Sequence, residues 1–271
     1  MSGVLERTLG ILELLSEQGQ GLELAVLADS LNMPKSAAHR LLADLVRYGY
    51  VRQTRDMGAY VLTTKLVSLG LTYLSKTGVV DVAQPLLDRL AEQTGELVRM
   101  SVVDGDRLTW VARAQGARQG LRYDPDMGSI ARLSCSSSGL AWLSTLNDDD
   151  ALALVSQQGL GLPKDFGPNA PKTLKEFLKV LRETRKQGFS LTEETYTPGL
   201  NAIAASVGLA GQLSMGTISV AGPSARLTRE RMLAIAPDVL SCAAQLAAAS
   251  GASPLLASGT AKVRLQPIYA A

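Results

Sequence analysis

Hydrophobic residues in the first fifty positions recur at intervals of three and four, in three successive segments. These segments cover residues 4–15, 24–31 and 34–47. Asn32 and Met33 interrupt the pattern just before Pro34, and proline is tolerated in the first turn of a new helix. The spacing therefore predicts three amphipathic helices, of which the second and third are joined by a tight turn.

Two short β-rich runs follow the third predicted helix. Gly49 is a helix stop, Tyr50–Val51 and Tyr60–Leu62 are typical of strands, and the tip between them, residues 52–58, is basic. Helices followed by a two-stranded wing make a winged helix-turn-helix, whose second motif helix enters the major groove of DNA. The pattern predicts a DNA-binding domain.

The third predicted helix has a polar face that suits DNA. Arg40 and Arg47 lie opposite its leucines, and arginine can donate two hydrogen bonds to guanine. Residues 34–55 carry five Lys or Arg side chains against one Asp, a local charge of +4. We expect Arg40 to contact a base, Ser36 and Arg47 to contact phosphates, and Arg55 to act from the wing. The full set of expected DNA contacts is Lys35, Ser36, Ala37, His39, Arg40, Arg47 and Arg55. The alternative is an ordinary helical hairpin with solvated cations.

The rest of the chain alternates between helical and β-rich segments. Residues 65–75 predict a short connecting helix, Asp104-Gly105-Asp106 a hairpin, and the pair Thr173 and Glu176 a helix start. Residues 121–123 predict a short strand, and Pro237 should divide the last helix. The fold class is α+β with a mostly antiparallel sheet. The expected domains are a DNA-binding domain at 1–64, a linker helix at 65–78, an effector domain at 79–251 and a tail without assigned role at 252–271.

Composition excludes several classes of protein. The chain has 271 residues, is 46% hydrophobic and carries a net charge of +2, so it can build two cores and any basic function must be local. Its single histidine, His39, lies on the predicted reading helix, which rules out Ser-His-Asp catalysis and histidine zinc sites elsewhere. No phosphate-binding loop or dinucleotide fingerprint occurs. We expect no catalytic residue, no metal and no cofactor.

Two further features bear on the compartment. Cys135 and Cys242 do not make a disulfide framework. No apolar run reaches the length of a membrane span, and Glu6 and Arg7 among helical leucines do not resemble a signal sequence. The expected location is cytoplasmic.

A run of small hydroxyl residues, 134–139, precedes the apolar helix predicted at 138–146. Free amides and hydroxyls at a helix start can hold an anion, and a small carboxylate is the natural guest. Leu121, Met127 and Leu133 are available to cover its apolar part. The alternative is that the serines only cap the helix.

Two other candidate groups favour structural roles. Nothing near Cys135 in the sequence would activate it as a nucleophile. The neighbouring carboxylates Glu193 and Glu194 should point to opposite faces of a strand, so they do not form an acid–base pair.

Three blocks in this order resemble the IclR-type transcriptional regulators. They are the reading motif ending in His39–Leu42 and Gly49–Val51, the 134–141 block, and the run from Gly188 through Glu194, Gly199 and Ala204 to Gly222-Pro223. The resemblance implies a winged helix-turn-helix, a linker helix and a GAF-like effector domain that binds a small metabolite. It also implies dimers through the N-terminal domains and tetramers through the effector domains.

The resemblance places the effector pocket at matching motif positions, which are Ser136, Ser137, Ser138, Thr192, Glu193, Ala204, Ser206, Ser219 and Ala221. Leu140 stands where similar proteins have lysine, and Ala221 where a second pocket serine is common. Both departures make the pocket less polar and favour an aromatic or medium-sized organic acid.

The sequence thus predicts a homodimeric or homotetrameric regulator of a catabolic operon. It binds double-stranded operator DNA, and a small carboxylate changes the spacing of its reading helices. The competing hypothesis is an enzyme acting on a small organic acid, with the helix-turn-helix as an interaction module.

Overall fold

The computed structural model describes residues 3–54, 58–125, 127–161, 163–209 and 212–250. The chain divides into two compact units, Met1–Lys76 and Thr77–Ala271, and each is considered by itself. Arg55 and the 252–271 tail lie outside the described residues.

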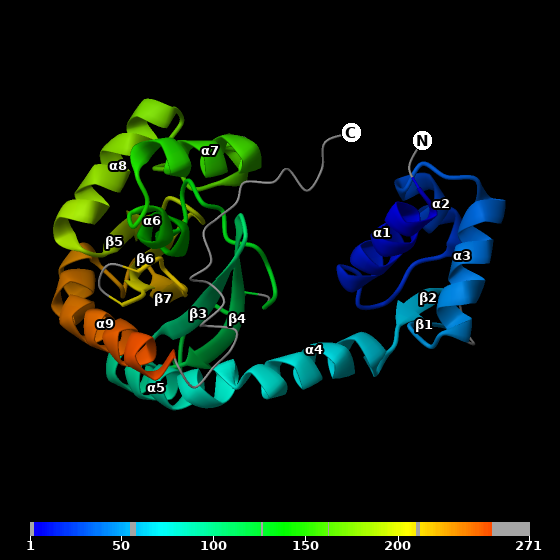
Figure 1. Ribbon diagram of the computed structural model, residues 1–271, viewed down its shortest axis with the longest axis horizontal. Helices are drawn as coiled ribbons and strands as arrows, with labels where there is room; N and C mark the ends of the chain where they lie inside the picture. The colour runs from blue at the N-terminus through cyan, green and yellow to red at the C-terminus, as the bar shows by residue number, and fades with distance from the viewer. Residues whose placement is uncertain (1–2, 55–57, 126, 162, 210–211, 251–271) are drawn as a thin grey trace. The chain divides into compact units, whose positions relative to one another are not determined.

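The first unit packs three helices and a small hairpin together, and helix α4 follows the hairpin (Figure 1). Its elements are α1 (Val4–Ser16), α2 (Leu24–Ser30), α3 (Lys35–Arg47), β1 (Val51–Gln53), β2 (Tyr60–Leu62) and α4 (Thr64–Thr77). The turn before α3 is tight because Asn32 adopts a left-handed φ of 46° and the Met33 amide donates to the Ala28 carbonyl at 2.9 Å. Pro34 then caps α3 with an extended backbone. The predicted helix-turn-helix and wing are confirmed.

The core of this unit is formed by the apolar stripes of its three helices. Ile11 of α1, Leu27 of α2 and Leu42 of α3 are completely buried. Tyr60 of β2 exchanges two backbone hydrogen bonds with Leu22, at 3.0 and 2.8 Å, which ties the hairpin to the start of α2. This packing leaves the polar side of α3 in solvent.

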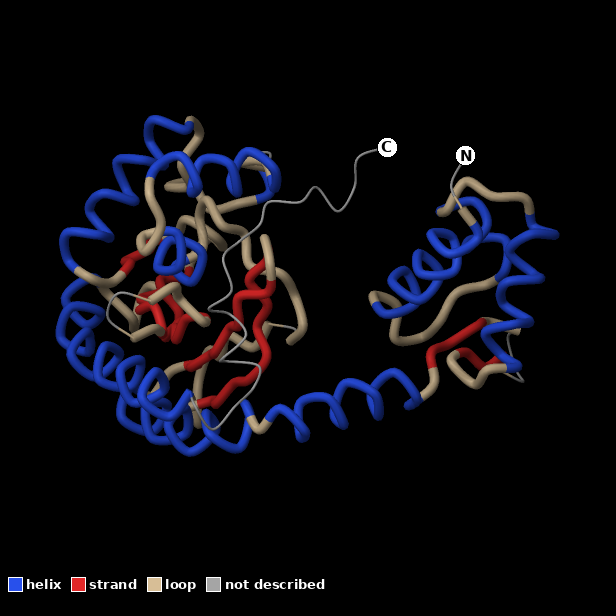
Figure 2. The backbone as a smooth tube through the Cα atoms, in the orientation of Figure 1, coloured by secondary structure: helices blue, strands red, loops and turns tan. Residues whose placement is uncertain are grey.

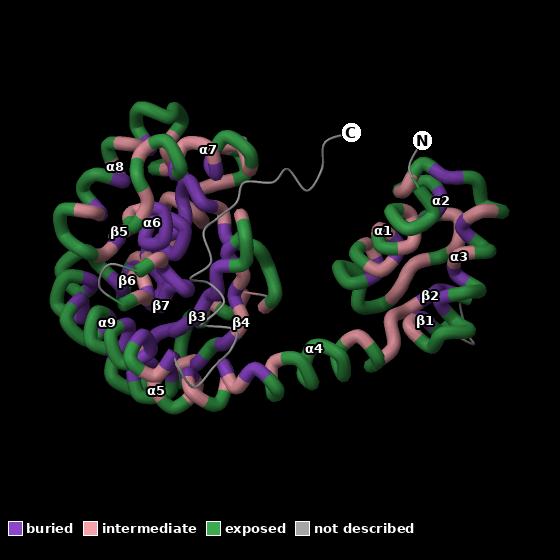
Figure 3. Tube along the Cα trace, viewed as in Figure 1, coloured by how far each residue is buried: buried purple, intermediate pink, exposed green. Residues whose placement is uncertain are grey.

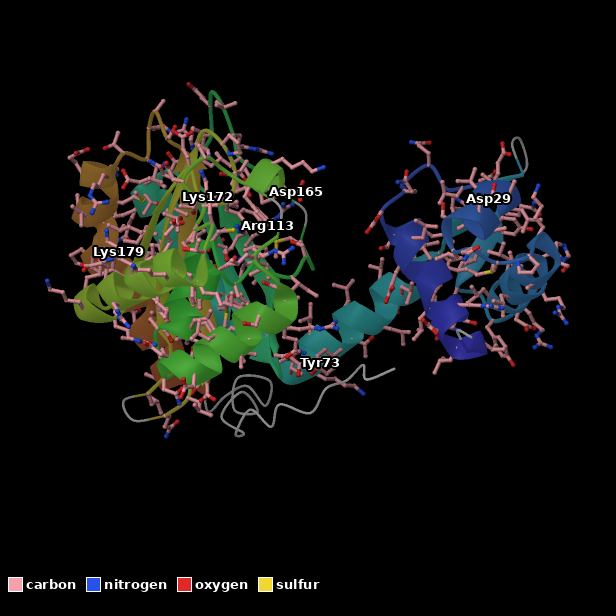
Figure 4. The ribbon with its side chains drawn as sticks, turned by 90° about the horizontal axis from the view of Figure 1, so that it is seen from above. Asp29, Tyr73, Arg113, Asp165, Lys172 and Lys179 are labelled. Carbon is pink, nitrogen blue, oxygen red and sulfur yellow. The ribbon has the colours of Figure 1, made fainter. Side chains whose placement is uncertain are left out.

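Helix α4 keeps much of its apolar surface exposed. Val67, Leu71 and Tyr73 are 58%, 62% and 57% exposed. Exposed and half-buried residues follow most of the helix in Figure 3, and Tyr73 is labelled in Figure 4. A helix with this surface is built to contact another surface.

The second unit contains one antiparallel sheet of five strands in the order β4-β3-β7-β6-β5. Its elements are α5 (Val79–Thr94), β3 (Leu97–Asp104), β4 (Arg107–Gln115), α6 (Ser137–Leu143), α7 (Asp148–Gln158), the 3-10 turn Pro163–Asp165, α8 (Leu174–Gln187), β5 (Ser190–Glu193), β6 (Leu200–Val207), β7 (Gly216–Pro223) and α9 (Arg229–Ala249). The predicted α+β class is confirmed.

Helices cover both faces of this sheet (Figure 2). The two faces differ in the side chains that they carry. Helices α5 and α9 lie against one face, to which β3 contributes Val98, Met100 and Val102. The opposite face packs against α6, where the Ser190 hydroxyl donates to the Ser137 carbonyl at 2.7 Å. Strand alternation gives this α6 side small and polar side chains, including Ser101 and Thr217, whose hydroxyl oxygens are 2.6 Å apart. An apolar layer therefore lies on one side of the sheet, whereas the α6 side combines small polar side chains with an apolar core that includes Leu108, Trp110 and Leu140.

Three sequence expectations are corrected. Residues 121–123 are not a strand. Pro237 does not divide α9, because its side of the helix faces solvent and the carbonyl it leaves free can bind water. The third is the expectation that no apolar run reaches the length of a membrane span, because α9 is long and apolar enough to do so by length and composition alone. Its buried residues Met232, Val239 and Leu246 instead make it a core helix beside α5 and β6.

Candidate functional site

The expected reading surface of α3 is exposed. Ala38, Leu42 and Leu45 are buried, and the opposite side carries Lys35, Ser36, His39 and Arg40, with Ala37 half-buried. Within the described part of the chain, Arg40 has no hydrogen-bond or ion-pair partner. Its guanidinium is therefore available to an external acceptor.

Arg47, the last residue of α3, already has partners. Its Nη2 lies 2.9 Å from Asp44 Oδ1, and its guanidinium lies 4.9 Å from the centre of the Tyr48 ring. Both side chains of the ion pair are more than half exposed, so the pair contributes little to stability. Arg47 can still turn toward a phosphate.

A small cavity lies in the second unit between α6 and the polar face of the sheet. It encloses about 30 Å³, room for on the order of two water molecules. Its walls come from β3, β4, α6, β5, β6 and β7, together with the loops at 123 and 196–197. The lining residues are Arg99, Trp110, Tyr123, Ser136, Ser137, Thr192, Tyr196, Thr197, Leu200, Asn201, Ala202 and Ala221.

Arg99 is part of this wall, and it is a buried charge, only 5% exposed. Its guanidinium carbon is 3.9 Å from the centre of the Trp110 ring and 5.7 Å from that of Tyr123. Burial lowers the pKa of Arg99, and the neighbouring hydroxyl groups of Tyr123 and Tyr196 oppose that shift. Because a guanidinium stays protonated in proteins, the interior of this unit holds a positive charge.

Ser136 and Ser138, at the start of α6, are held by internal hydrogen bonds. The Ser136 hydroxyl donates to the Arg132 carbonyl and caps the helix by accepting from the Gly139 amide at 3.0 Å. Ser138 accepts from the Trp110 indole nitrogen at 3.4 Å. Within this block the capping role is that of Ser136, which fills the N-cap of the seven-residue helix α6.

Four of the twelve expected effector contacts line the cavity, namely Ser136, Ser137, Thr192 and Ala221. The apolar cover is placed differently from the expectation. Leu121 is 72% exposed, Leu133 is completely buried in the core beneath α6, and Met127 packs against that same core. These three side chains do not line the cavity.

Four other expected contacts face the polar interior but bond to the protein itself. Ser206 donates to Ser214 at 2.7 Å, Ser219 donates to the Arg99 carbonyl at 3.4 Å, and the Ala204 carbonyl accepts from Ser190. Ser138 is bonded to Trp110 as described. They surround the cavity without lining it.

Glu193 lies on the other face of the sheet. Its Oε2 accepts from Arg229 Nη1 at 2.6 Å, at the start of α9. Glu194 accepts from the Gly199 amide at 2.9 Å. The expected divergence of the two carboxylates is confirmed, and Glu193 is removed from the effector contacts.

The sequence reasoning missed the cation and the aromatic walls. The signal for Arg99 was present, because a lone charge interrupts the otherwise apolar strand 97–103. Trp110, Tyr123 and Tyr196 gave no comparable signal, since aromatic residues are common in any β-rich core. Their convergence depends on strand pairing and loop course.

Reactive groups are scarce in this region. Cys135 is buried and free, and burial raises the pKa of its thiol to about 12. Among the described residues, no group of three His, Cys, Asp or Glu side chains could hold a metal ion. The residues that line the cavity supply a cation, aromatic rings and hydroxyl groups, which can bind a ligand.

Comparisons with known proteins cover both units. The family model "IclR helix-turn-helix domain" matches residues 4–55, and "Bacterial transcriptional regulator IclR C-terminal" matches residues 71–248. The chain is 28% identical to the transcriptional repressor IclR of Escherichia coli K12 over 248 residues, 91% of this chain and 89% of that protein.

Solved structures share the fold. The IclR regulator of Alicyclobacillus acidocaldarius superposes with a TM-score of 0.78 at 20% identity, over 92% of this chain and 98% of that one. An IclR homologue of Microbacterium hydrocarbonoxydans complexed with 4-hydroxybenzoate has a TM-score of 0.73 at 17% identity, over 91% and 100%.

The curated relatives are transcriptional repressors, so the enzyme hypothesis is set aside. The exposed face of α3 and the polar interior of the second unit fall in the two matched regions. The chain belongs to the IclR family of DNA-binding transcriptional regulators.

Proposed function

We propose that the protein is a repressor of a catabolic operon that is released from its operator by a small organic acid. The observation that carries this proposal is the small cavity of the second unit, which has aromatic walls and a few convergent polar groups. Sheet interiors are normally filled with apolar side chains, and a few convergent polar groups in such a space are typical of ligand sites. The homologue complexed with 4-hydroxybenzoate supports an organic acid as the ligand.

On the DNA side, α3 supplies the contacts. Arg40 contacts a base in the major groove, and Ser36 and Arg47 contact phosphates, with Lys35, Ala37 and His39 beside them. Arg55 extends the contact from the wing. The operator is double-stranded DNA with two half-sites, and the protein acts in the cytoplasm.

Dimerisation follows from exposed apolar helix surfaces. Val4 and Leu5 of α1 are 73% and 71% exposed, and Leu71 and Tyr73 of α4 are 62% and 57% exposed. Contiguous apolar surface of this kind marks protein–protein contacts. A dimer places two α3 helices one DNA turn or a multiple of it apart, and the effector units can pair dimers into tetramers.

The test is gel retardation of the DNA upstream of the protein's own operon. We expect retardation of a palindromic fragment that weakens steeply with salt, because phosphate contacts release counterions. Pools of organic acids at millimolar concentration are then added, and one pool should release the DNA. Retardation that is equal on any DNA would contradict the operator, and release by no acid pool would contradict the effector.

A further inference from the structure

Arg99 is a buried cation that lacks an acidic partner. It lies in the middle of β3 and is 5% exposed, yet in the described part of the chain no Asp or Glu oxygen lies within ion-pair distance of it. Its Nε is buried and has no hydrogen-bond partner. Since buried charges in proteins are normally paired, this guanidinium is short of one anion.

The groups around Arg99 are aromatic. Trp110 stacks on its guanidinium at 3.9 Å, and the Tyr196 ring meets Trp110 edge to face, with centroids 6.2 Å apart and planes at 62°. Ser137 and Thr192 add hydroxyls to the same cavity wall. The cavity thus combines one cation with flat apolar walls and a few neutral polar groups.

We propose that Arg99 binds the carboxylate of the effector, and that the effector is an arene monocarboxylate whose ring lies against Trp110 and Tyr196. This inference rests on the proposed function and specifies its ligand. A guanidinium binds a carboxylate through two parallel hydrogen bonds, which gives the ligand an orientation as well as affinity. One cation balances one anion, so a dicarboxylate would bury an unpaired charge and is rejected.

The ligand takes the place of Tyr123. The free space of about 30 Å³ is smaller than an aromatic ring, so one wall has to move. Tyr123 lies in the connection after β4. This connection is tethered by polar contacts that water can replace, so we take Tyr123 as the wall that moves. Gln115 donates to the Tyr123 carbonyl at 2.9 Å, and Arg113, labelled in Figure 4, pairs with Asp124 at 2.5 Å. The ligand carboxylate then lies beside Arg99, where the Tyr123 ring lies in the unliganded protein.

The test compares charged and neutral ligands on the full-length protein. Benzoate, 4-hydroxybenzoate, phenylacetate and 1-naphthoate are titrated by calorimetry, each beside its primary amide. The chain has two tryptophans, so fluorescence with Trp142→Phe isolates the Trp110 signal. At least one carboxylate should bind and shift Trp110 emission, and its amide should bind about 100-fold more weakly, because a charge-assisted pair is lost.

The decisive measurement is the affinity of Arg99 variants for the carboxylate. Arg99→Met should weaken that carboxylate by about 100-fold and Arg99→Lys by about 10-fold, since lysine keeps the charge but loses the two-point geometry. Arg118→Met is the matched control, because Arg118 is 84% exposed and contacts Glu92 only at 3.7 Å. The Arg118→Met protein should bind the carboxylate with the affinity of the wild type.

The inference is overturned if no carboxylate of the panel binds, if an amide binds equally well, or if Arg99→Met keeps the affinity. Gel retardation distinguishes a failure of this inference from a failure of the proposed function. Arg99→Met should still bind DNA but resist release. Release of Arg99→Met by an acid would leave the proposed function standing without Arg99, whereas a wild type that binds no specific DNA would remove the proposed function alone.

Discussion

Arg226 binds Glu96 through two nitrogens, with Nε 2.5 Å from Oε1 and Nη2 2.8 Å from Oε2. The Glu96 side chain is 5% exposed, and the pair joins the start of β3 to the turn after β7, 130 residues apart. Gly222 leaves the space for it, because a Cβ there would lie 2.4 Å from Glu96 Oε2. The ion pair thus ties the turn after β7 to the start of β3.

Removing Arg226 should therefore destabilise the second unit. Arg226→Ala leaves the Glu96 carboxylate buried without a partner, and we expect the free energy of unfolding in urea to fall by about 1–3 kcal/mol. Arg118→Ala, which removes an exposed pair, should change it by less than about 0.5 kcal/mol. Equal effects of the two variants would show that the Glu96 pair contributes no more to stability than an exposed ion pair.

Gly139 should not accept a side chain. A Cβ there would lie 2.6 Å from Leu133 Cα and 2.7 Å from the Leu133 carbonyl oxygen, so α6 would have to move off the cavity wall. Gly139→Ala should cost about 2–4 kcal/mol of unfolding free energy, the scale of an overpacked core. Gly70→Ala in α4 meets nothing within 4 Å and should stabilise by about 0.5–1 kcal/mol. A stable Gly139→Ala protein would contradict this packing.

Without ligand, loss of the Arg99 charge should not weaken the fold. Arg99→Met removes an unpaired buried charge at the cost of its stacking on Trp110, so we expect unfolding free energy unchanged or raised by about 1 kcal/mol. Thermal unfolding followed by circular dichroism measures this. A loss above about 2 kcal/mol would mean that Arg99 is needed for folding rather than for the ligand.

Arg40 should contribute more to operator recognition than Arg47. Arg40→Ala should weaken binding by about 1–3 kcal/mol and relax preference at one base pair, as expected for a side chain that reads a base. Arg47→Ala should weaken all sequences alike and reduce the salt slope by about one. Lys175→Ala, an exposed cation on α8, is the control and should leave retardation unchanged. An unaffected Arg40→Ala would remove α3 as the base reader.

Stability should fall at alkaline pH. Burial raises the pKa of Cys135 to about 12 and that of Cys242 to about 11, from 9.0. The unfolded chain therefore loses these protons first, so the contribution is present below pH 9 and declines above it, by up to about 1.4 kcal/mol per pH unit and thiol. Urea unfolding between pH 8 and 10 should show the slope, and Cys135→Ala with Cys242→Ala should flatten it. A slope that is unchanged in the double variant would show that other groups cause the pH dependence of stability.

Local chemistry made much of the fold predictable. Pro34 and the spacing around Leu42 fixed the reading motif, Thr173 caps α8 through the Glu176 amide, and Gly105 with φ of 60° turns the β3–β4 hairpin. Each of these signals acts within a few residues. Pro237 was misread because whether a proline breaks a helix depends on which side of it meets solvent.

The site was harder to predict because it is assembled across the chain. Strand β3 pairs with β7, which places Arg99 opposite Ser219, and no local pattern contains that register. Leu121 and Leu133 were equally apolar in the sequence, yet one is exposed and the other is fully buried. Motif similarity located the serine block but not the guanidinium beside it.

The unlike faces of the central sheet also bear on how the protein can be re-engineered. Val98, Met100 and Val220 form the layer on which folding depends, while Thr192, Ala202 and Ala221 on the other side carry little apolar area. Libraries confined to the second set can exchange the recognised metabolite at low risk of misfolding. The same backbone can thus serve as a starting point for biosensors of different compounds.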